Sequence, residues 1–232
     1  MSLKEKIYTI PVTDAFREDC ECPFCALEDK LEAESLDFYL GGALMEPDYR
    51  IEMNEHGFCK THLDALFNSK KNVLGLGLIL TSFFNRYNER LSAQIERAIK
   101  KNDKSSLDDL KMFLAKSNAD CTICNKLRNT MKRYISVFYH MWKTEKEFKA
   151  IFESKKGFCR KHFIMLLEDL DDSLKNKDKE QFLNVLFDMQ LKNLNRLQSE
   201  VKWFTEKFDY QNNDKPWGNS RDAVQRCIEK LK

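Results

Sequence analysis

Apolar residues recur along most of this chain at the three- and four-residue spacing of an α-helix. Phe83, Tyr87 and Leu91 form one such row, and Phe182, Leu186 and Met189 form another. Residues at this spacing share one helix face, so each row predicts a face that packs against other helices. The alternation of apolar and polar residues that would predict strands is scarce. The pattern therefore predicts an all-α fold, a tandem-duplicated helical bundle.

The expected helices recur in a similar order in the two halves of the chain. Pro23 suits the first position of a helix that Gly41 and Gly42 would end, and a loop through Pro47 would follow. A short helix is expected after Thr13. The other expected helices span about 23–40, 59–67, 73–101, 106–115, 121–142, 145–152, 159–170, 179–208 and 221–231.

Composition narrows the class of protein. The 232 residues include only seven Gly and four Pro, and 42% are hydrophobic, which is enough for a sizeable core.

The longest apolar stretch, near residues 73–84, is shorter than the roughly 20 residues that a membrane helix needs. The opening residues lack the apolar run of a secretory signal. We therefore expect a cytoplasmic protein, in which eight cysteines favour metal or redox chemistry over structural disulfides.

Six of the eight cysteines fall in a pattern that occurs twice. In the first copy, 33 residues separate a CxxC pair from the cysteine of GFCKTH, and in the second copy, 34 residues separate the pair from the cysteine of GFCRKH. The copies are offset by 99 residues at the first pair and by 100 at the second, which indicates a tandem duplication. We expect repeats over 1–104 and 105–232, the second with a C-terminal helix, packed as one unit. The candidate ligands are Cys22, Cys25, Cys59, His62, Cys121, Cys124, Cys159 and His162.

The spacing of these residues suits a metal. Two cysteines three residues apart share one side of a helical turn, and so do a cysteine and a histidine at that spacing. Two such pairs supply three thiolates and one imidazole, the ligand set of a tetrahedral Cys3His zinc site. Gly57 and Gly157 permit a tight approach before each cysteine. The sequence therefore predicts two zinc ions per chain.

Other interpretations of the same residues stay open. The cysteines could be metal-free buried thiols or redox dithiols. The ligands could also hold an iron–sulfur cluster, although the histidine in each set favours zinc. The spacing does not decide whether each site forms within one copy or by exchange of pairs between copies. Cys20 could replace Cys22 as a ligand, whereas Cys227, His56 and His140 are expected to lie outside the sites.

The two copies differ in charge. Between Cys22 and His62, nine acidic and three basic residues give a net charge of −6; between Cys121 and His162, three acidic and eleven basic residues give +8. These charges could dock the two halves, or a basic face could bind an acidic protein or a nucleic acid. A nucleic-acid reader is usually more basic than this chain, so a protein partner or self-association is favoured over nucleic acid. The candidate contacts are Lys126, Arg128, Lys132, Arg133, Lys155, Lys156, Arg160 and Lys161.

No enzyme motif accompanies the candidate ligands. The sequence lacks HExxH, a phosphate-binding loop and a dinucleotide fingerprint, and no small-molecule substrate is evident. Four protein ligands also close a tetrahedral zinc, whereas catalytic zinc keeps an open position. We therefore expect a zinc-stabilised helical module that binds another macromolecule. The alternative is a thiol-based redox or metal sensor, in which oxidation of the thiolates releases the metal.

Several stretches resemble a known family. These are the paired CPxC and GFCxxH motifs, the opening IPVTDAF at residues 10–16 and the ending FDYQNNDKPWGNSRDA at residues 208–223. Together they resemble an uncharacterised bacterial family known only as a domain of unknown function. The resemblance covers essentially the whole chain. It implies a bacterial cytosolic protein and no established activity, so the ligand assignment depends on spacing alone.

Overall fold

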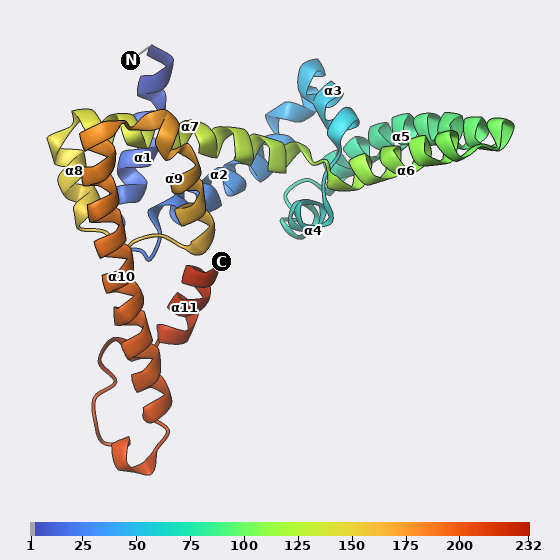
Figure 1. Cartoon of the computed structure of the whole chain (residues 1–232). Coiled ribbons are helices and arrows are strands. Elements are labelled where there is room, and N and C mark those ends of the chain that lie inside the picture. Colours follow the sequence, from blue (N-terminus) through green and yellow to red (C-terminus); the bar gives the residue numbers. More distant parts are fainter. Residues whose placement is uncertain (1–2) are drawn as a thin grey trace. The chain divides into compact units, whose positions relative to one another are not determined.

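The structure, a computed structural model, describes residues 3–232, and every regular element in this range is helical (Figure 1). The predicted all-α fold is therefore confirmed. The α-helices are α1 (Leu3–Arg17), α2 (Pro23–Leu40), α3 (Pro47–His56), α4 (Lys60–Asn68), α5 (Val73–Lys101), α6 (Lys104–Ala119), α7 (Thr122–Thr144), α8 (Lys146–Glu153), α9 (Arg160–Ser173), α10 (Asn176–Glu206) and α11 (Ala223–Leu231); the 3-10 helices are η1 (Gly42–Met45), η2 (Tyr210–Asn212) and η3 (Gly218–Ser220).

Two segments are more helical than the sequence predicts. The expected loop before Gly57 contains η1 and α3, and α1 extends from Leu3 instead of beginning after Thr13. Pro47 is the first residue of α3, where the missing N–H leaves no helical hydrogen bond unmade and the fixed φ suits a helix. This proline therefore starts a helix rather than marking a loop.

The chain forms two compact units whose boundaries fall inside α2 and α7. Unit 1 contains the residues up to 29 together with 131–232, and unit 2 contains residues 30–130. This division follows contacts in space, whereas the predicted repeats 1–104 and 105–232 describe a duplication in the sequence. The repeat boundaries stay a prediction.

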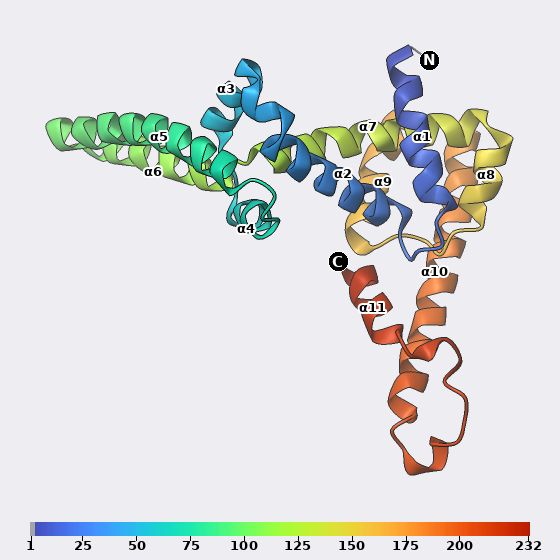
Figure 2. The same cartoon turned by 180° about the vertical axis from the view of Figure 1, so that it is seen from behind.

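Unit 1 has an aromatic core. Phe16 of α1, Phe24 of α2 and Phe138 of α7 have ring centroids 5.3–5.5 Å apart, and all three side chains are fully buried. Phe152 and Phe182 extend the cluster into α8 and α10, where these helices lie close to α1 in both views (Figure 2). Each such ring pair contributes about 0.5–1.5 kcal/mol beyond the area that it buries. Unit 1 therefore has a large core of its own.

Unit 2 is built on the hairpin of α5 and α6, which run side by side in both views. Tyr87 stacks on Phe113 across this hairpin, with ring centroids 5.7 Å apart. The buried apolar side chains of α5 are Leu76 and Ile79, close to its start, whereas Ile99 near the tip is 73% exposed. The core of unit 2 therefore lies near α3, α4 and the beginning of α5.

Helix α5 also contains the longest apolar stretch of the sequence. That stretch gives way to charged residues from Arg86 onward. Within residues 3–232, no helix combines the length and the apolar character that crossing a bilayer requires.

Candidate metal centres

All four predicted ligand pairs lie at helix N-termini. Cys59 and Cys159 are the N-cap residues of α4 and α9, and Cys22 and Cys121 directly precede α2 and α7. The second ligand of each pair comes three residues later, on the same face of the first turn. The backbone N–H of His162, for example, points at Sγ of Cys159 from 3.5 Å. Free N–H groups and the helix dipole at these positions favour thiolates.

Site A consists of Cys22, Cys25, Cys159 and His162, all in unit 1. Nδ1 of His162 lies 3.6 Å from Sγ of Cys22, 3.4 Å from Sγ of Cys25 and 3.2 Å from Sγ of Cys159. The sulfurs of Cys25 and Cys159 are 3.4 Å apart. Three of the four residues are buried, and Cys25 is half-buried.

Site B consists of Cys59, His62, Cys121 and Cys124, all in unit 2. Nδ1 of His62 lies 3.2 Å from Sγ of Cys59, 3.3 Å from Sγ of Cys121 and 3.4 Å from Sγ of Cys124. The sulfurs of Cys59 and Cys124 are 3.9 Å apart. Both of these cysteines are half-buried, so site B has two partly accessible sulfurs where site A has one.

Both sites have the dimensions of a tetrahedral zinc centre. Zn–S bonds of about 2.3 Å and Zn–N bonds of about 2.0–2.1 Å at tetrahedral angles place sulfur and nitrogen about 3.5 Å apart and two sulfurs about 3.8 Å apart. In each site the four ligand atoms lie within 4.8 Å of one another. Each group could therefore hold one metal ion with four protein ligands.

The ligand pairs are exchanged between the two copies of the motif. Site A joins the CxxC pair of the first copy to the CxxH pair of the second, and site B joins the remaining two pairs. The sequence left this point open. As a result, ligands in site A come from chain positions separated by as many as 140 residues. A metal in such a site would close a long loop, which restricts the unfolded chain most.

A carboxylate lies behind each histidine. Oε1 of Glu32 is 3.1 Å from Nε2 of His62, and Oε2 of Glu28 is 3.4 Å from Nε2 of His162. A histidine that ligates metal through one nitrogen commonly donates its other N–H to a carboxylate, which fixes the tautomer and raises ligand basicity. Both histidines therefore present Nδ1 to the sulfurs with a carboxylate near Nε2, although the Nε2 of His162 makes no hydrogen bond at its distance of 3.4 Å from Glu28.

Hydrogen bonds among the ligands shift their pKa values. A hydrogen bond to the Cys121 thiolate raises the pKa of His62 to about 9 against the opposing effect of burial. Burial is the largest effect on Cys121 and would raise its pKa, but the hydrogen bonds from His62 and from the backbone of Cys124 and Cys59 together lower this pKa to about 6. In site A, hydrogen bonds from Cys22 and Cys25 hold the pKa of Cys159 far below its usual value. A metal would replace these protons, so its binding releases them.

The two GFC turns are held differently. Gly57 and Gly157 have φ values of 60° and 83°, which favour glycine. The carbonyl of Gly57 accepts two hydrogen bonds of 2.9 Å from Thr122, one from its N–H and one from its hydroxyl. In unit 1, the side-chain amide of Gln190 instead brackets the backbone of Phe158, with both hydrogen bonds 2.9 Å long.

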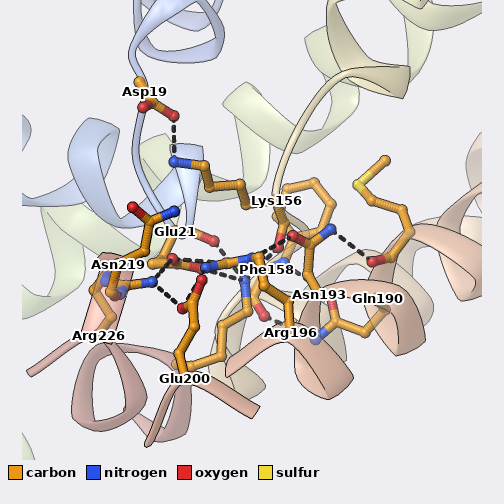
Figure 3. Close-up of polar contacts among 12 residues, drawn as sticks. Asp19, Glu21, Lys156, Phe158, Gln190, Asn193, Arg196, Glu200, Asn219 and Arg226 are labelled. Carbon is orange, nitrogen blue, oxygen red and sulfur yellow. Dashed lines mark hydrogen bonds and ion pairs between the residues drawn. The ribbon is translucent and has the colours of Figure 1, made fainter. Parts of the chain in front are cut away.

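A buried ionic network surrounds the segments that lead into site A (Figure 3). Glu21, which is 4% exposed, accepts hydrogen bonds of 2.7 Å from Arg196, and Arg226 binds Glu200 at 2.5 Å. Lys230 of α11 is 3% exposed. Its ammonium donates to the backbone carbonyls of Glu21 and Lys156 at 2.6 Å each, so it joins the segments that precede Cys22 and Cys159.

Most of the predicted basic contacts are engaged within the chain. Lys126 lies 4.3 Å from the ring centroid of Phe38, and Arg133 donates to the hydroxyl of Tyr8 at 3.0 Å. Within the described residues, the side chains of Lys126, Lys132 and Arg160 have no ion pair or hydrogen bond, and Lys126 has only its contact with the aromatic rings. The remaining contacts are Arg128 with Asn125, Lys155 with the carbonyl of Glu18, Lys156 with Asp19 and Lys161 with Glu28.

The other cysteines and histidines lie outside the two groups, as expected. Cys20 is half-buried, and burial raises its pKa to about 11. Cys227 is half-buried on α11, and His140 is exposed on α7. His56 is half-buried, and its Nδ1 lies 2.6 Å from Oδ2 of Asp120.

Sequence reasoning missed several supporting residues. Glu28 follows Cys25 by three residues, so helical spacing alone could have placed it beside the site. Lys230 and Gln190 carried no such signal, because each contacts a segment at least 32 residues away in the chain.

The geometry can now be set beside known proteins. A model described as "Family of unknown function (DUF6062)" matches residues 3–232. The chain belongs to this family. It is 24% identical over 197 residues to the "Uncharacterized 23.9 kDa protein in xynA 3'region" of Caldicellulosiruptor sp. (strain Rt8B.4), an alignment that covers 85% of this chain and 86% of the relative. No solved structure matches the chain.

Proposed function

We propose that each Cys3His site binds one zinc ion, and that the zinc-stabilised helical module binds another macromolecule. The observation that carries the metal assignment is the convergence of three sulfurs and one imidazole nitrogen at zinc-like distances, twice in one chain. Four protein ligands leave no open position for a substrate, which is the arrangement of structural rather than catalytic zinc. Thiolates with one imidazole suit zinc better than magnesium, calcium or manganese.

Exposed apolar residues support a protein as the partner. Phe187, Leu191 and Leu194 lie at i, i+4 and i+7 on α10 and are 40–62% exposed. Val224, Ile228 and Leu231 repeat this spacing on α11 and are 41–67% exposed. Contiguous apolar surface on a folded protein commonly marks an interaction site. The basic residues support this role less, because most of them already contact the chain itself.

Native mass spectrometry tests the metal assignment. We expect two zinc ions per chain, one in Cys159→Ser and two in the control Cys20→Ser, because Cys20 lies outside both sites. A fully helical chain without metal would contradict the assignment. For the partner, Leu191→Asp with Ile228→Asp should abolish self-association or partner binding in sedimentation experiments while metal content stays at two.

The half-buried sulfurs favour a second candidate function, a thiol-based redox or metal sensor. Cys25, Cys59 and Cys124 are accessible enough for an oxidant to reach, and oxidation of a zinc thiolate removes a ligand. Peroxide added to the zinc-loaded chain would then release zinc and reduce helicity, and a thiol reductant with zinc would restore both. Zinc that stays bound under peroxide would rule the sensor out.

A further inference from the structure

Unit 2 contains a polar cleft that the metal sites do not use. The cleft has a volume of about 130 Å³. A cavity needs about 10–15 Å³ of such space to hold one water, so the cleft has room for more than one. A smaller hollow shares most of its walls and adds Tyr87. The lining residues are Glu55, His56, Arg90, Phe113, Lys116, Ser117 and Asp120, from α3, α5, α6 and the turn before α7.

The charges of the cleft are unbalanced. Glu55 is already paired with Arg86, whose Nη2 donates to it at 2.6 Å. Asp120 is paired with His56. Arg90 and Lys116 have no ion-pair or hydrogen-bond partner within the part of the chain that the structure describes. With His56 neutral, Arg86, Arg90 and Lys116 outnumber Glu55 and Asp120, so the cleft is net positive, and the apolar ring of Phe113 lines it beside these charges.

The histidine is oriented by its neighbour. Oδ2 of Asp120 lies 2.6 Å from Nδ1 of His56, and Oδ1 of Asp120 accepts a hydrogen bond of 2.8 Å from Asn125. An ionised carboxylate only accepts, so Nδ1 carries the proton. In the neutral imidazole the lone pair is then on Nε2, which has no partner within residues 3–232. Nε2 of His56 can therefore accept a hydrogen bond from a ligand in the cleft.

We propose that this cleft binds a phosphate group. Arg90 offers a planar fork and Lys116 a compact ammonium, the two side chains that proteins use most for phosphate oxygens. Near neutral pH a phosphate also carries an O–H in part of its population, because its second pKa is about 6. That O–H matches the lone pair on Nε2 of His56. Sulfate has the same shape and oxygens but no proton to donate, so the cleft prefers phosphate to sulfate.

This inference goes beyond the zinc sites and does not depend on a macromolecular partner. The test uses the full chain with its metals and inorganic phosphate as the probe, followed by backbone amide shifts in an NMR titration. We expect saturable binding at one site, with the largest shifts at His56, Arg90 and residues 113–120. Arg90→Gln and Lys116→Gln should each weaken binding roughly tenfold, the effect of losing one charged hydrogen bond. The control Lys100→Gln changes a residue of α5, the helix of Arg90, that does not line the cleft, and it should bind phosphate like the parent.

His56→Gln separates the role of the imidazole from that of the charges. We expect the parent to bind phosphate more tightly than sulfate, and this variant to bind both equally. A parent that binds both anions equally would overturn the role of His56. No saturable binding up to tens of millimolar, or an equal loss in Lys100→Gln, would overturn the site. Native mass spectrometry should find two metal ions in every variant. A loss of phosphate binding can then be distinguished from a loss of zinc.

The source of the phosphate is tested with phenyl phosphate. A cleft that takes the end group of a larger molecule binds the ester at least as tightly as inorganic phosphate, with the same dependence on Arg90. A cleft that takes the free anion rejects the ester. Ester binding that is insensitive to both Arg90→Gln and Lys116→Gln would contradict the proposal.

Discussion

Site A and site B use the same four ligand types at the same helix positions, yet the surrounding structure differs. Behind site A, Lys230 of α11 hydrogen-bonds to the segments that lead to Cys22 and Cys159. Behind site B, Thr122 makes two hydrogen bonds to the carbonyl of Gly57. The residue that corresponds to Thr122 in the first CxxC is Pro23, which has no N–H to donate.

This difference shows how a duplicated motif can diverge around unchanged ligands. Pro23 gives α2 a favourable start but removes a local hydrogen bond, and the C-terminal helix supplies others. Unit 1 also has the aromatic core, whereas α6 of unit 2 buries no apolar side chain. We infer that unit 2 depends more on its metal than unit 1 does, and that site B releases metal first.

The largest expected effect comes from removing one ligand from each site. Cys59→Ser should lose the site B metal and more helical protection in unit 2 than Cys159→Ser loses in unit 1, because the core of unit 2 is smaller. Cys159→Ser should lose the site A metal but leave unit 1 partly folded. In both variants, the loss of unfolding free energy should be smaller than the about 10–16 kcal/mol that zinc binding contributes in zinc-finger peptides, because those peptides have almost no core of their own. Amide hydrogen exchange measures the protection of each unit separately. Equal loss of protection in the two variants would contradict the inference that unit 2 depends more on its metal than unit 1 does.

The next effect concerns the buried ammonium of Lys230. Lys230→Met leaves two backbone carbonyls and part of the Glu21 charge without a partner, so unit 1 should lose about 3–5 kcal/mol of unfolding free energy. The control Lys232→Met removes an exposed ion pair with Asp29, and its effect should be below about 1 kcal/mol. Chemical denaturation measures both. Similar losses of unfolding free energy in the two variants would show that Lys230 does not stabilise the segments that lead to site A.

The carboxylates behind the histidines give a smaller effect. Glu32→Gln should weaken zinc binding at site B, and Glu28→Gln at site A, by about 10–100-fold each, because a neutral amide replaces the charged carboxylate near the histidine Nε2. Glu34→Gln, on the exposed side of the same helix, is the matched control. Competition with a fluorescent chelator measures these affinities. Unchanged zinc affinities in Glu32→Gln and Glu28→Gln would mean that the carboxylates do not contribute to zinc binding.

The smallest expected effect belongs to one hydroxyl. Thr122→Val removes a hydrogen bond to the carbonyl of Gly57 but keeps the backbone N–H bond, so unit 2 should lose about 1 kcal/mol. Thr61→Val, at an exposed position of α4, should cost less. The rate of zinc transfer from site B to a chelator should rise in Thr122→Val only. A matching rise at site A would contradict the assignment of this bond to site B.

These contrasts also show what the sequence could predict. The helical periodicity and the repeated Cys/His spacing are local features, and they correctly indicated an all-α fold and the eight residues that form the two groups. The exchange of pairs could not be predicted, because spacers of 33 and 34 residues allow either pairing, and only the fold brings the N-terminus of α2 to that of α9 and the N-terminus of α4 to that of α7. Helix α3 was missed because Pro47 was taken for a loop signal.

The central claim is that two metal sites form from ligand pairs exchanged between the copies. Cadmium-113 NMR of the cadmium-loaded chain tests it most directly, since each site gives its own signal. We predict two signals, with Cys22→Ser and Cys159→Ser perturbing the same one and Cys59→Ser perturbing the other. If Cys22→Ser and Cys59→Ser perturbed one common signal and Cys159→Ser the second, each site would form within its own copy, and the account would be contradicted.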